Sequence, residues 1–540
     1  GDKTGATPGD WPLFDQALQE INAWKPDFAV MIGDMIQGDS VDAGRIQEQW
    51  GEFNSHIRAL EVPLFVIPGN HDISNPFMLE WWRATLGRTY YSFTYRDCLF
   101  IMLNTMEYWK DFAAYLGDEQ IRYALDAIRK HPNVRHTFVF LHVPHWLDDT
   151  NAEWPILEQA LASRPHTVFA GHIHRNTYEE RNGGQYLVVT ATKGDKPLVS
   201  PPKAPELGVF PAWAQISVEG SQAQLTLVEP GAGRTWPANI APTANLKALR
   251  NLVTQEALMP EKVGDGIWKT GFVTTVVNQL PGVVKLQLAV QHPFGDAWKP
   301  ISEKDAALSL EVLPGEKQAV VQTFHVPESQ LTPAPRIATE VTYKEVSLYR
   351  QAERNVPVFP KEALRWPREW MVLASPYDSG DMSDVPSDDP RSEWPLLFVS
   401  HPAESGYKPD ESLAENGRVL TWRALPVMER EDSAIVDLGP LSDLPLKVFT
   451  YASTYVYSPT ARIAYAQFRV DDYGQILVNG KMIEDGRVFR TRRDPVFVAL
   501  PLHEGWNNVT VKPINIVGGW TFRLLFADPE KDLRFANAPQ

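Results

Sequence analysis

The sequence predicts an α/β layered domain, with β-sheets flanked by helices, followed by two all-β sandwich domains. Up to about residue 228, helical stretches alternate with short apolar strands, which is the order typical of helices layered on sheets. Beyond that point, short alternating runs separated by Gly, Pro, Asn and Asp replace the helices. A chain of 540 residues also exceeds what one core usually supports. We therefore expect three domains, over residues 1–228, 240–351 and 360–540.

The first domain is predicted from hydrophobic periodicity. Apolar residues recur at helical spacing from Trp11 to Trp24, and a short apolar run that ends at Ile32 follows them. The same order repeats further along the chain. The expected helices cover residues 11–24, 42–59 and 119–130, and the expected strands cover residues 28–32, 64–67 and 137–141. In domains of this kind, ligands collect at the carboxyl ends of the strands.

The two β domains are predicted from runs that alternate between apolar and polar residues. Residues 229–239 contain Pro and Gly and are expected to form a linker. Residues 283–290 indicate a small sandwich of the immunoglobulin or fibronectin type, and residues 464–470 and 496–500 indicate a third, all-β domain. The turn motifs of this last domain, such as Gly505-Trp506-Asn507, resemble those of galactose-binding-like jelly-roll modules. That resemblance implies a glycan contact without naming a residue for it.

Composition narrows the class of partner. The formal charge of −16 would repel phosphate backbones and anionic membranes, so we expect a small substrate and no nucleic acid. The single cysteine, Cys98, rules out an intrachain disulfide. No apolar run approaches the roughly 20 residues needed to span a bilayer. Because no strand or signal peptide precedes Asp2, we expect a longer native product, and the accessory β domains favour a bacterial periplasmic or secreted enzyme.

Four short motifs, together with one lone histidine, bring carboxylate, amide and imidazole groups into the first domain. They are Gly1-Asp2-Lys3-Thr4-Gly5, Gly33-Asp34, Gly69-Asn70-His71-Asp72, His142 and Gly171-His172-Ile173-His174. Mn, Fe and Zn ions accept this mixture of oxygen and nitrogen ligands. Each motif alone has a plain structural explanation, because Gly-Asp is a common turn and His-x-His pairs are often exposed. In this order, with apolar strands ahead of the later motifs, they predict a metal site.

These motifs resemble those of the calcineurin-like metallophosphoesterases over residues 1–192. The resemblance implies a metallophosphoesterase domain with two divalent metal ions held by Asp2, Asp34, Asn70, His142, His172 and His174. Asp34 would bridge the two ions. Asn70, His142 and His172 would complete one site, and Asp2 and His174 would hold the other. It also implies that His71, oriented by Asp72, acts near the leaving group.

One position departs from the family pattern. The first motif of the family is usually Asp-x-His, whereas Thr4 stands here where the second ligand belongs. This leaves one of the two sites without its usual imidazole and leaves open a weaker site, a different ion or a single-metal enzyme. Gln37 stands where purple acid phosphatases carry tyrosine, so no tyrosinate-bound iron is expected. The identity of the metal, Mn, Fe or Zn, is open.

The residues beside the metal motifs are candidates for contact with substrate. His145 follows His142 closely and either lines the pocket or serves the fold. Arg175 and Asn176 follow His174, and a guanidinium matches phosphate oxygens in shape.

The predicted function is hydrolysis of a phosphomonoester or phosphodiester by metal-activated hydroxide. Two alternatives are kept. One is a degenerate phosphoesterase scaffold that acts as a secreted glycan-binding or structural protein, suggested by Thr4. The other is a metal-dependent nuclease, which the absence of a dense basic stripe disfavours.

Overall fold

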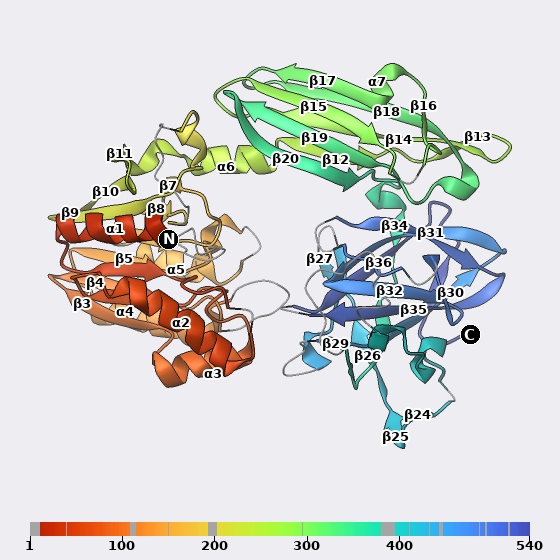
Figure 1. The fold of residues 1–540 in the computed structure, drawn as a ribbon, viewed down its shortest axis with the longest axis horizontal. Coiled ribbons are helices and arrows are strands. Elements are labelled where there is room, and N and C mark those ends of the chain that lie inside the picture. The colour runs from red at the N-terminus through yellow and green to blue at the C-terminus, as the bar shows by residue number, and fades with distance from the viewer. Residues whose placement is uncertain are drawn as a thin grey trace. The chain divides into compact units, whose positions relative to one another are not determined.

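The computed structural model describes residues 11–539 apart from 39, 108–114, 149–150, 193–201, 294, 380–394, 410, 431–432, 442–446, 485–486, 492–493 and 517–518 (Figure 1). The chain divides into two compact units, Gly1–Arg250 and Asn251–Gln540. The first unit contains both helices and sheets, and the second consists largely of sheets. Among the described residues, no helix is long and apolar enough to cross a membrane.

Up to residue 170 the first unit alternates helices and strands, except that two antiparallel strands, at 91–95 and 98–102, follow each other directly. Its helices are α1 (Trp11–Trp24), α2 (Ala43–Ile57), α3 (Pro76–Thr85), α4 (Gly117–Lys130), α5 (Trp154–Leu161) and α6 (Thr243–Arg250). Its strands are β1 (Ala29–Ile32), β2 (Leu64–Ile67), β3 (Tyr91–Tyr95), β4 (Cys98–Met102), β5 (His136–Phe140), β6 (His166–Ala170), β7 (Thr177–Arg181), β8 (Gly184–Val188), β9 (Trp213–Glu219), β10 (Gln222–Glu229) and β11 (Arg234–Pro237).

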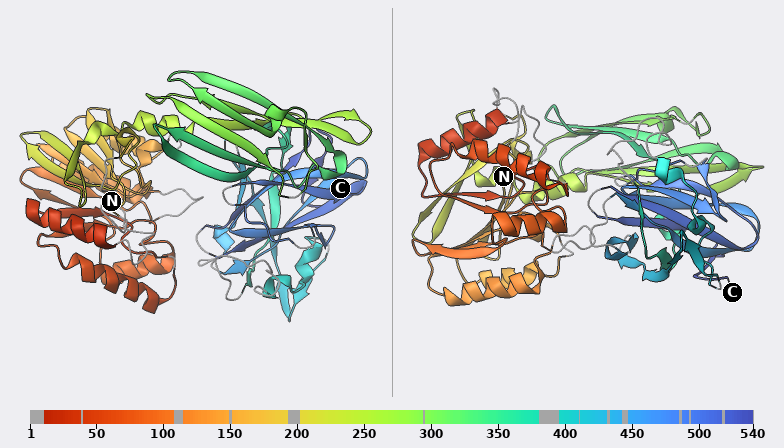
Figure 2. Two further views of the ribbon diagram at one scale, coloured as in Figure 1. Left: turned by 45° about the horizontal axis from the view of Figure 1, so that its top comes forward. Right: turned by 60° about the horizontal axis from the view of Figure 1, so that its bottom comes forward.

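These strands form separate sheets that face one another across a common core. β1 pairs with β2 in parallel, β9, β10 and β11 form an antiparallel sheet, and the third sheet has the order β3-β4-β5-β6-β8-β7. β4, β5 and β6 are buried at every residue, because helices cover one face and the other sheets cover the other. α4 and α5 pack on the outer face of this third sheet, whereas α1, α2 and α3 pack on β1 and β2. Helices therefore form the two outer layers of the unit (Figure 2).

The register of the parallel strands brings the predicted motifs toward one edge. Ile32 pairs with Ile67, so β1 and β2 end at the same level, and Gly33 and Pro68 follow them. β5 and β6 are also parallel and adjacent, and they end two or fewer residues before His142 and His172. The carboxyl ends of these strands are where loops can present side chains to a ligand.

The predicted helices and strands of this unit are all present with shifts of at most two residues at their ends. The prediction of a linker over residues 229–239 is wrong, because residues 229–237 continue the sheet. β10 and β11 form an antiparallel hairpin in which Leu227 pairs with Trp236. The Glu229 carboxylate is fully buried there and accepts a 2.7 Å hydrogen bond from Arg234 Nη2 as well as one from Trp236 Nε1. The predicted boundaries of the three domains stay predictions.

The second unit consists of paired β-sheets. One pair of sheets has the orders β12-β14-β18-β16 and β17-β15-β19-β20, and the other has the orders β27-β28-β36-β31-β34 and β23-β29-β35-β30-β22-β26. The strands in these orders are β12 (Val253–Ala257), β14 (Ile267–Val277), β15 (Val284–Gln291), β16 (Lys299–Pro300), β17 (Ala307–Val312), β18 (Lys317–Pro327), β19 (Arg336–Tyr343), β20 (Val346–Asn355), β22 (Glu369–Leu373), β23 (Tyr377–Asp378), β26 (Trp422–Pro426), β27 (Met428–Arg430), β28 (Ser433–Asp437), β29 (Val448–Phe449), β30 (Ala452–Ser458), β31 (Arg462–Asp471), β34 (Val496–Leu502), β35 (Gly505–Asn515) and β36 (Thr521–Ala527).

A shared core joins the last two sheets. Trp370 and Val509 come from one sheet, Phe468 and Phe522 come from the other, and all four are buried in one hydrophobic cluster. Such interdigitation of inward-facing side chains is how two sheets pack as a sandwich. The prediction of an α/β layered domain followed by all-β sandwich structure is confirmed.

Candidate metal centre

The loop after β1 turns sharply at Gly33 and Asp34. Both residues have positive φ, 93° and 56°, and His172 in the loop after β6 has a φ of 69°. A side chain at Gly33 would place its Cβ 2.6 Å from the backbone nitrogen of Gly69 and from Nδ1 of His142, so glycine is required there. Asp and His adopt positive φ only at an energetic cost, so surrounding contacts must hold these residues in that conformation. Strained backbone at residues with metal-ligand side chains is typical of functional sites.

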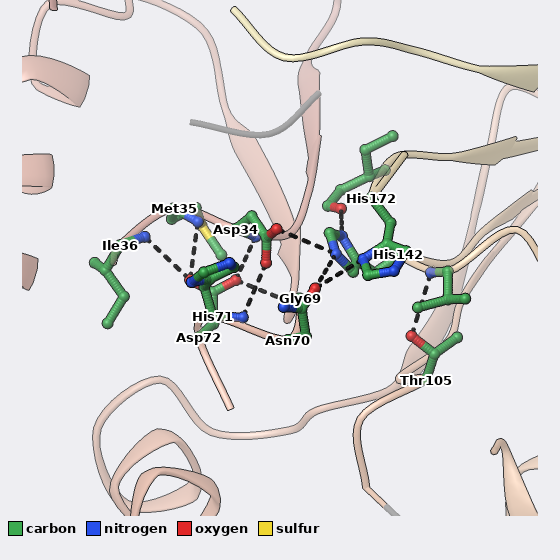
Figure 3. Close-up of polar contacts among 12 residues, drawn as sticks. Asp34, Met35, Ile36, Gly69, Asn70, His71, Asp72, Thr105, His142 and His172 are labelled. Atoms are coloured by element: carbon green, nitrogen blue, oxygen red, sulfur yellow. Dashed lines mark hydrogen bonds and ion pairs between the residues drawn. The ribbon is translucent and has the colours of Figure 1, made fainter. Parts of the chain in front are cut away.

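Four side chains from the predicted motifs meet at this point (Figure 3). Oδ2 of Asp34 lies 3.3 Å from Nε2 of His142, which in turn lies 3.0 Å from Oδ1 of Asn70. Nδ1 of His172 lies 2.8 Å from the same Asn70 oxygen. One ligand atom each from Asp34, His142 and His172 lie within 4.8 Å of one another. Two imidazole nitrogens, a carboxylate and an amide oxygen suit Zn, Mn or Fe.

The orientation of His142 fits ligation. This ring is fully buried, and its Nδ1 lies 2.7 Å from the backbone carbonyl oxygen of Ile32. Because a carbonyl can only accept a hydrogen bond, the proton is on Nδ1 and the lone pair of Nε2 points toward the Asp34 and Asn70 oxygens. Metal-ligating histidines commonly donate their other nitrogen to a backbone carbonyl in this way.

The carboxylate of Asp72 organises the backbone of the same loops. It accepts hydrogen bonds from the backbone nitrogens of Asp34 at 2.6 Å, Met35 at 2.9 Å, Ile36 at 3.3 Å and Gly69 at 2.8 Å. The side chain is 2% exposed. Burial and the charge of Asp34 raise its pKa to about 7. Asp72 therefore holds the two ligand loops together through their backbones.

The prediction that Asp72 orients the ring of His71 needs correction, since a backbone carbonyl does so. Nδ1 of His71 lies 2.7 Å from the carbonyl oxygen of Gln37 and donates to it. The tautomer selected by this bond carries its lone pair on Nε2. The backbone nitrogen of His71 also donates a 3.0 Å hydrogen bond to Oδ1 of Asp34.

The charge state of Asp34 reflects the same contacts. Burial raises the pKa of this carboxyl. When His142 carries a proton on Nε2 as well as on Nδ1, its charge and its hydrogen bond to Asp34, together with the proximity of His71, outweigh burial. The net result is a pKa below the usual range of an aspartate. Asp34 is therefore a carboxylate at neutral pH, which is the form that binds a cation.

The remaining predicted ligands are not part of this cluster as described. Asp2 lies outside the described residues, together with Thr4. His174 is exposed, with a φ of 49°, and is not one of the three side chains grouped above. The second metal site implied by Asp2 and His174 stays a prediction.

The predicted substrate residues Arg175 and Asn176 contact the segment around 205–210. Nη1 of Arg175 donates to the carbonyl oxygen of Leu207 at 3.2 Å. Nδ2 of Asn176 donates to Phe210 at 2.8 Å, and its Oδ1 accepts from the backbone nitrogen of Thr190 at 3.1 Å. Asn176 is 1% exposed, so these bonds position loops behind the site. A substrate contact by either residue stays a prediction.

His145 lies buried in the short 3₁₀ turn at 145–147, with 2% of its surface exposed. Its Nδ1 accepts a 2.8 Å hydrogen bond from Nδ2 of Asn151, which leaves the proton on Nε2. Nε2 makes no hydrogen bond with the part of the chain that the structure describes. Burial lowers the pKa of His145 to about 4.

Lowering the pH from 7 to 4 is expected to weaken the fold through His145. The unfolded chain protonates this ring near pH 6.5, whereas the folded chain keeps it neutral down to about pH 4. The unfolded state then binds more protons, so the contribution of His145 to stability is complete above pH 6.5 and is lost as the pH falls toward 4. The difference between the pKa of His145 in the unfolded chain and in the folded chain corresponds to about 3 kcal/mol of unfolding free energy.

Urea unfolding at several pH values measures this effect. A His145→Gln variant should show a shallower fall in unfolding free energy between pH 6.5 and 4 than wild type. His503→Gln, at an exposed histidine of the second unit, is the matched control and should keep the wild-type slope. Equal slopes for wild type and His145→Gln would contradict the assignment.

Two contributors to the site were missed by sequence reasoning. The carbonyls of Ile32 and Gln37 orient His142 and His71, respectively. Every residue has such a carbonyl, so no residue type marks these positions. Their sequence signal is their nearness to the Gly33-Asp34 motif, since Ile32 directly precedes Gly33 and Gln37 lies three residues after Asp34.

Comparison with known proteins supports the assignment of the first domain. Residues 5–176 match the family of calcineurin-like phosphoesterases, so this part of the chain is a calcineurin-like phosphoesterase domain. The matched span contains Asp34, Asn70, His142 and His172. It begins after Asp2.

Comparisons with curated proteins and with solved structures identify no relative of the whole chain. No curated protein matches the chain. Solved structures that it resembles include an anti-sigma factor domain-containing protein from Clostridium clariflavum, at 8% identity and a TM-score of 0.18, covering 54% of this chain and 90% of that one. The secreted serine protease VesC from Vibrio cholerae matches at 11% identity and a TM-score of 0.16, covering 61% and 63%.

Proposed function

We propose that the protein hydrolyses a phosphomonoester or phosphodiester of a small molecule with the help of bound divalent metal. The observation that carries this proposal is the convergence of Asp34, Asn70, His142 and His172 at the edge of the sheets. The family match over residues 5–176 supports it. Three of the four ligand atoms would be neutral, so the site would keep positive charge for an anionic substrate once a divalent ion is bound.

Different residues of the site would bind the metal and transfer the proton. Asp34, Asn70, His142 and His172 would hold the ion. A divalent cation bound there supplies Lewis acidity, which lowers the pKa of a water molecule and neutralises charge on a phosphoryl group. His71, oriented by the Gln37 carbonyl, would have to be protonated on Nε2 as well, and it would then give that proton to the departing oxygen as the bond to phosphorus breaks.

A second ion would require residues beyond this cluster. We propose Asp2 and His174 for that role, with Asp34 shared between the two ions, as in the resemblance described above. Thr4 would then stand in place of an imidazole, which predicts a second ion bound more weakly than the first. Metal stoichiometry in wild type and in His174→Ala tests this, since only a two-ion site would lose metal in that variant.

The experiment that tests the function combines metal analysis with turnover. Wild type reconstituted with Mn is assayed on p-nitrophenyl phosphate and on bis(p-nitrophenyl) phosphate, beside His172→Ala. His172 is exposed, so its removal leaves the core intact. His503→Ala removes an exposed histidine of the second unit and serves as the matched control.

We expect His172→Ala to lose metal and to turn over both esters at least tenfold more slowly, while His503→Ala matches wild type. The ratio of the two ester rates in wild type then separates monoesterase from diesterase activity. Wild type that binds no Mn and hydrolyses neither ester would overturn the proposal and favour a scaffold without catalysis.

A further inference from the structure

Two arginines face each other on the outer side of one sheet in the second unit. Arg469 of β31 and Arg523 of β36 are directly opposed partners in the antiparallel pairing of these strands, which lie side by side (Figure 1). Their neighbours in the chain, Phe468 and Phe522, are buried in the core between the two sheets. Because successive side chains of a strand point to opposite faces, both arginines are on the face away from that core. We refer to them as the arginine pair.

The arginine pair places two positive charges side by side. Directly opposed residues of antiparallel strands have Cβ atoms about 4.5–5.5 Å apart, so both side chains can reach one point, and like charges there destabilise the pairing. Burial and the charge of Arg469 lower the pKa of Arg523 to about 10. Both groups are therefore charged at neutral pH and repel each other.

Neither arginine has a partner that would neutralise its charge. Among the residues that the structure describes, neither guanidinium forms an ion pair or a hydrogen bond, and Nε of Arg523 is buried without an acceptor. Arg523 is partly buried, whereas Arg469 is exposed. A buried donor without an acceptor has lost its bonds to water, and this loss costs more for a charged group. A bound ion is one explanation for such a donor in a native protein.

Carboxylates near these strands are engaged elsewhere, and in the described part of the chain none of them forms an ion pair with the arginine pair. Asp494, just ahead of β34, accepts hydrogen bonds from the backbone and the side chain of Asn355, at 2.9 Å and 2.7 Å. Asp437 of β28 accepts one at 2.9 Å from a backbone nitrogen two residues further along. Asp471 of β31 stands opposite Thr521 and not opposite an arginine. The counter-ion of the arginine pair must therefore come from another molecule.

The geometry points to a binding site for a tetrahedral oxyanion, a phosphate or sulfate group, between Arg469 and Arg523. A guanidinium is a planar fork of N–H donors that matches the oxygens of such a group. Two forks on neighbouring strands suit a single group that carries two negative charges and several oxygens. The bound group would give both guanidinium ions an acceptor and would replace their repulsion by two attractions. This site belongs to the second unit and does not depend on the proposed hydrolysis.

Isothermal titration of inorganic phosphate into the full chain tests this site. Arg469→Gln and Arg523→Gln each remove one charge and keep a polar side chain. Arg462→Gln is the matched control, because Arg462 lies on the same strand but pairs with Asp532, with 3.0 Å between Nη1 and Oδ2. Phosphate held by a metal ion in the first unit would be the same in all these proteins, so a difference between them reports on the arginine pair.

We expect wild type to bind phosphate and sulfate at least about tenfold more tightly than Arg469→Gln or Arg523→Gln does, and Arg462→Gln to match wild type. Acetate, with one charge and two oxygens, should bind more weakly than phosphate. In urea without phosphate or sulfate, Arg469→Gln should be no less stable than wild type, because the repulsion is gone. Added phosphate should then raise the unfolding midpoint of wild type more than that of this variant.

Glycerol 3-phosphate distinguishes the source of the phosphate group. Binding of this ester that requires both arginines would show that the site accepts a phosphate group on a larger molecule, whereas binding of inorganic phosphate alone would limit the site to the free ion. Equal phosphate affinity in wild type and in both arginine-pair variants would overturn the inference. So would acetate that binds as tightly as phosphate, or an Arg462→Gln protein that binds phosphate as weakly as those variants, since net charge alone would then explain the loss.

Discussion

The Asp34→Asn variant is expected to lose bound metal and to hydrolyse p-nitrophenyl phosphate roughly 10²–10³-fold more slowly than wild type. Asparagine has the shape of aspartate, so the loop and the hydrogen bond from the His71 backbone can persist. The variant removes the one negative charge of the cluster formed with Asn70, His142 and His172. The ligands that remain are neutral, and neutral oxygen and nitrogen ligands alone hold a divalent ion less tightly.

Metal analysis and steady-state kinetics after reconstitution with Mn measure this outcome. Asp27→Asn is the matched control, because Asp27 is an exposed carboxylate of the same unit that pairs with Arg96 at 2.9 Å. It should retain both metal and turnover. An Asp34→Asn protein with full metal content and wild-type turnover would show that Asp34 is not a ligand. An Asp34→Asn protein that keeps its full metal content but loses turnover would show that Asp34 acts in the reaction and is not needed for metal binding.

The Asp72→Ala variant is expected to lose on the order of 4 kcal/mol of unfolding free energy together with its bound metal. Alanine would leave the backbone N–H groups of Asp34, Met35, Ile36 and Gly69 without their acceptor. Each buried donor left unsatisfied costs about 1–3 kcal/mol unless water reaches it. Because these donors lie in both ligand loops, their release would also displace Asp34 and Asn70.

Urea unfolding and metal analysis check this prediction. Asp42→Ala is the matched control, because Asp42 also accepts two backbone hydrogen bonds, at the start of α2, but does so at the surface. Its loss should cost about 1 kcal/mol and leave the metal in place. If Asp72→Ala proves no less stable than Asp42→Ala, then water satisfies the four amides and the carboxylate is not what joins the loops.

The secondary structure of the first domain could be predicted from local pattern. Helix α1 and strand β2 occur at the predicted residues, because apolar spacing over one element reports which face of that element is buried. The segment at 229–239 was mispredicted for a related reason. Its Gly and Pro residues are typical of a linker, but the pairing of β10 with β11 depends on Glu229 being buried against Arg234, which is not visible in the local sequence.

The residue types of the candidate site were likewise visible in the sequence, whereas their roles were not. Asp34, Asn70, His142 and His172 were predicted as ligands, and the structure brings them together. The partner of Asp72 was predicted wrongly. The neighbouring His71 suggested a side-chain pair, but the carboxylate turns inward to backbone amides on a loop that lies 36 to 38 residues away in the chain.

The sequence by itself determined which segments are helix or strand and which side chains can bind a metal, because both depend on the order and chemistry of neighbouring residues. Only the tertiary structure decided which of these side chains meet. Asn70 and His172 are 102 residues apart, and the register of parallel strands with the turns that follow them brings the two within 2.8 Å.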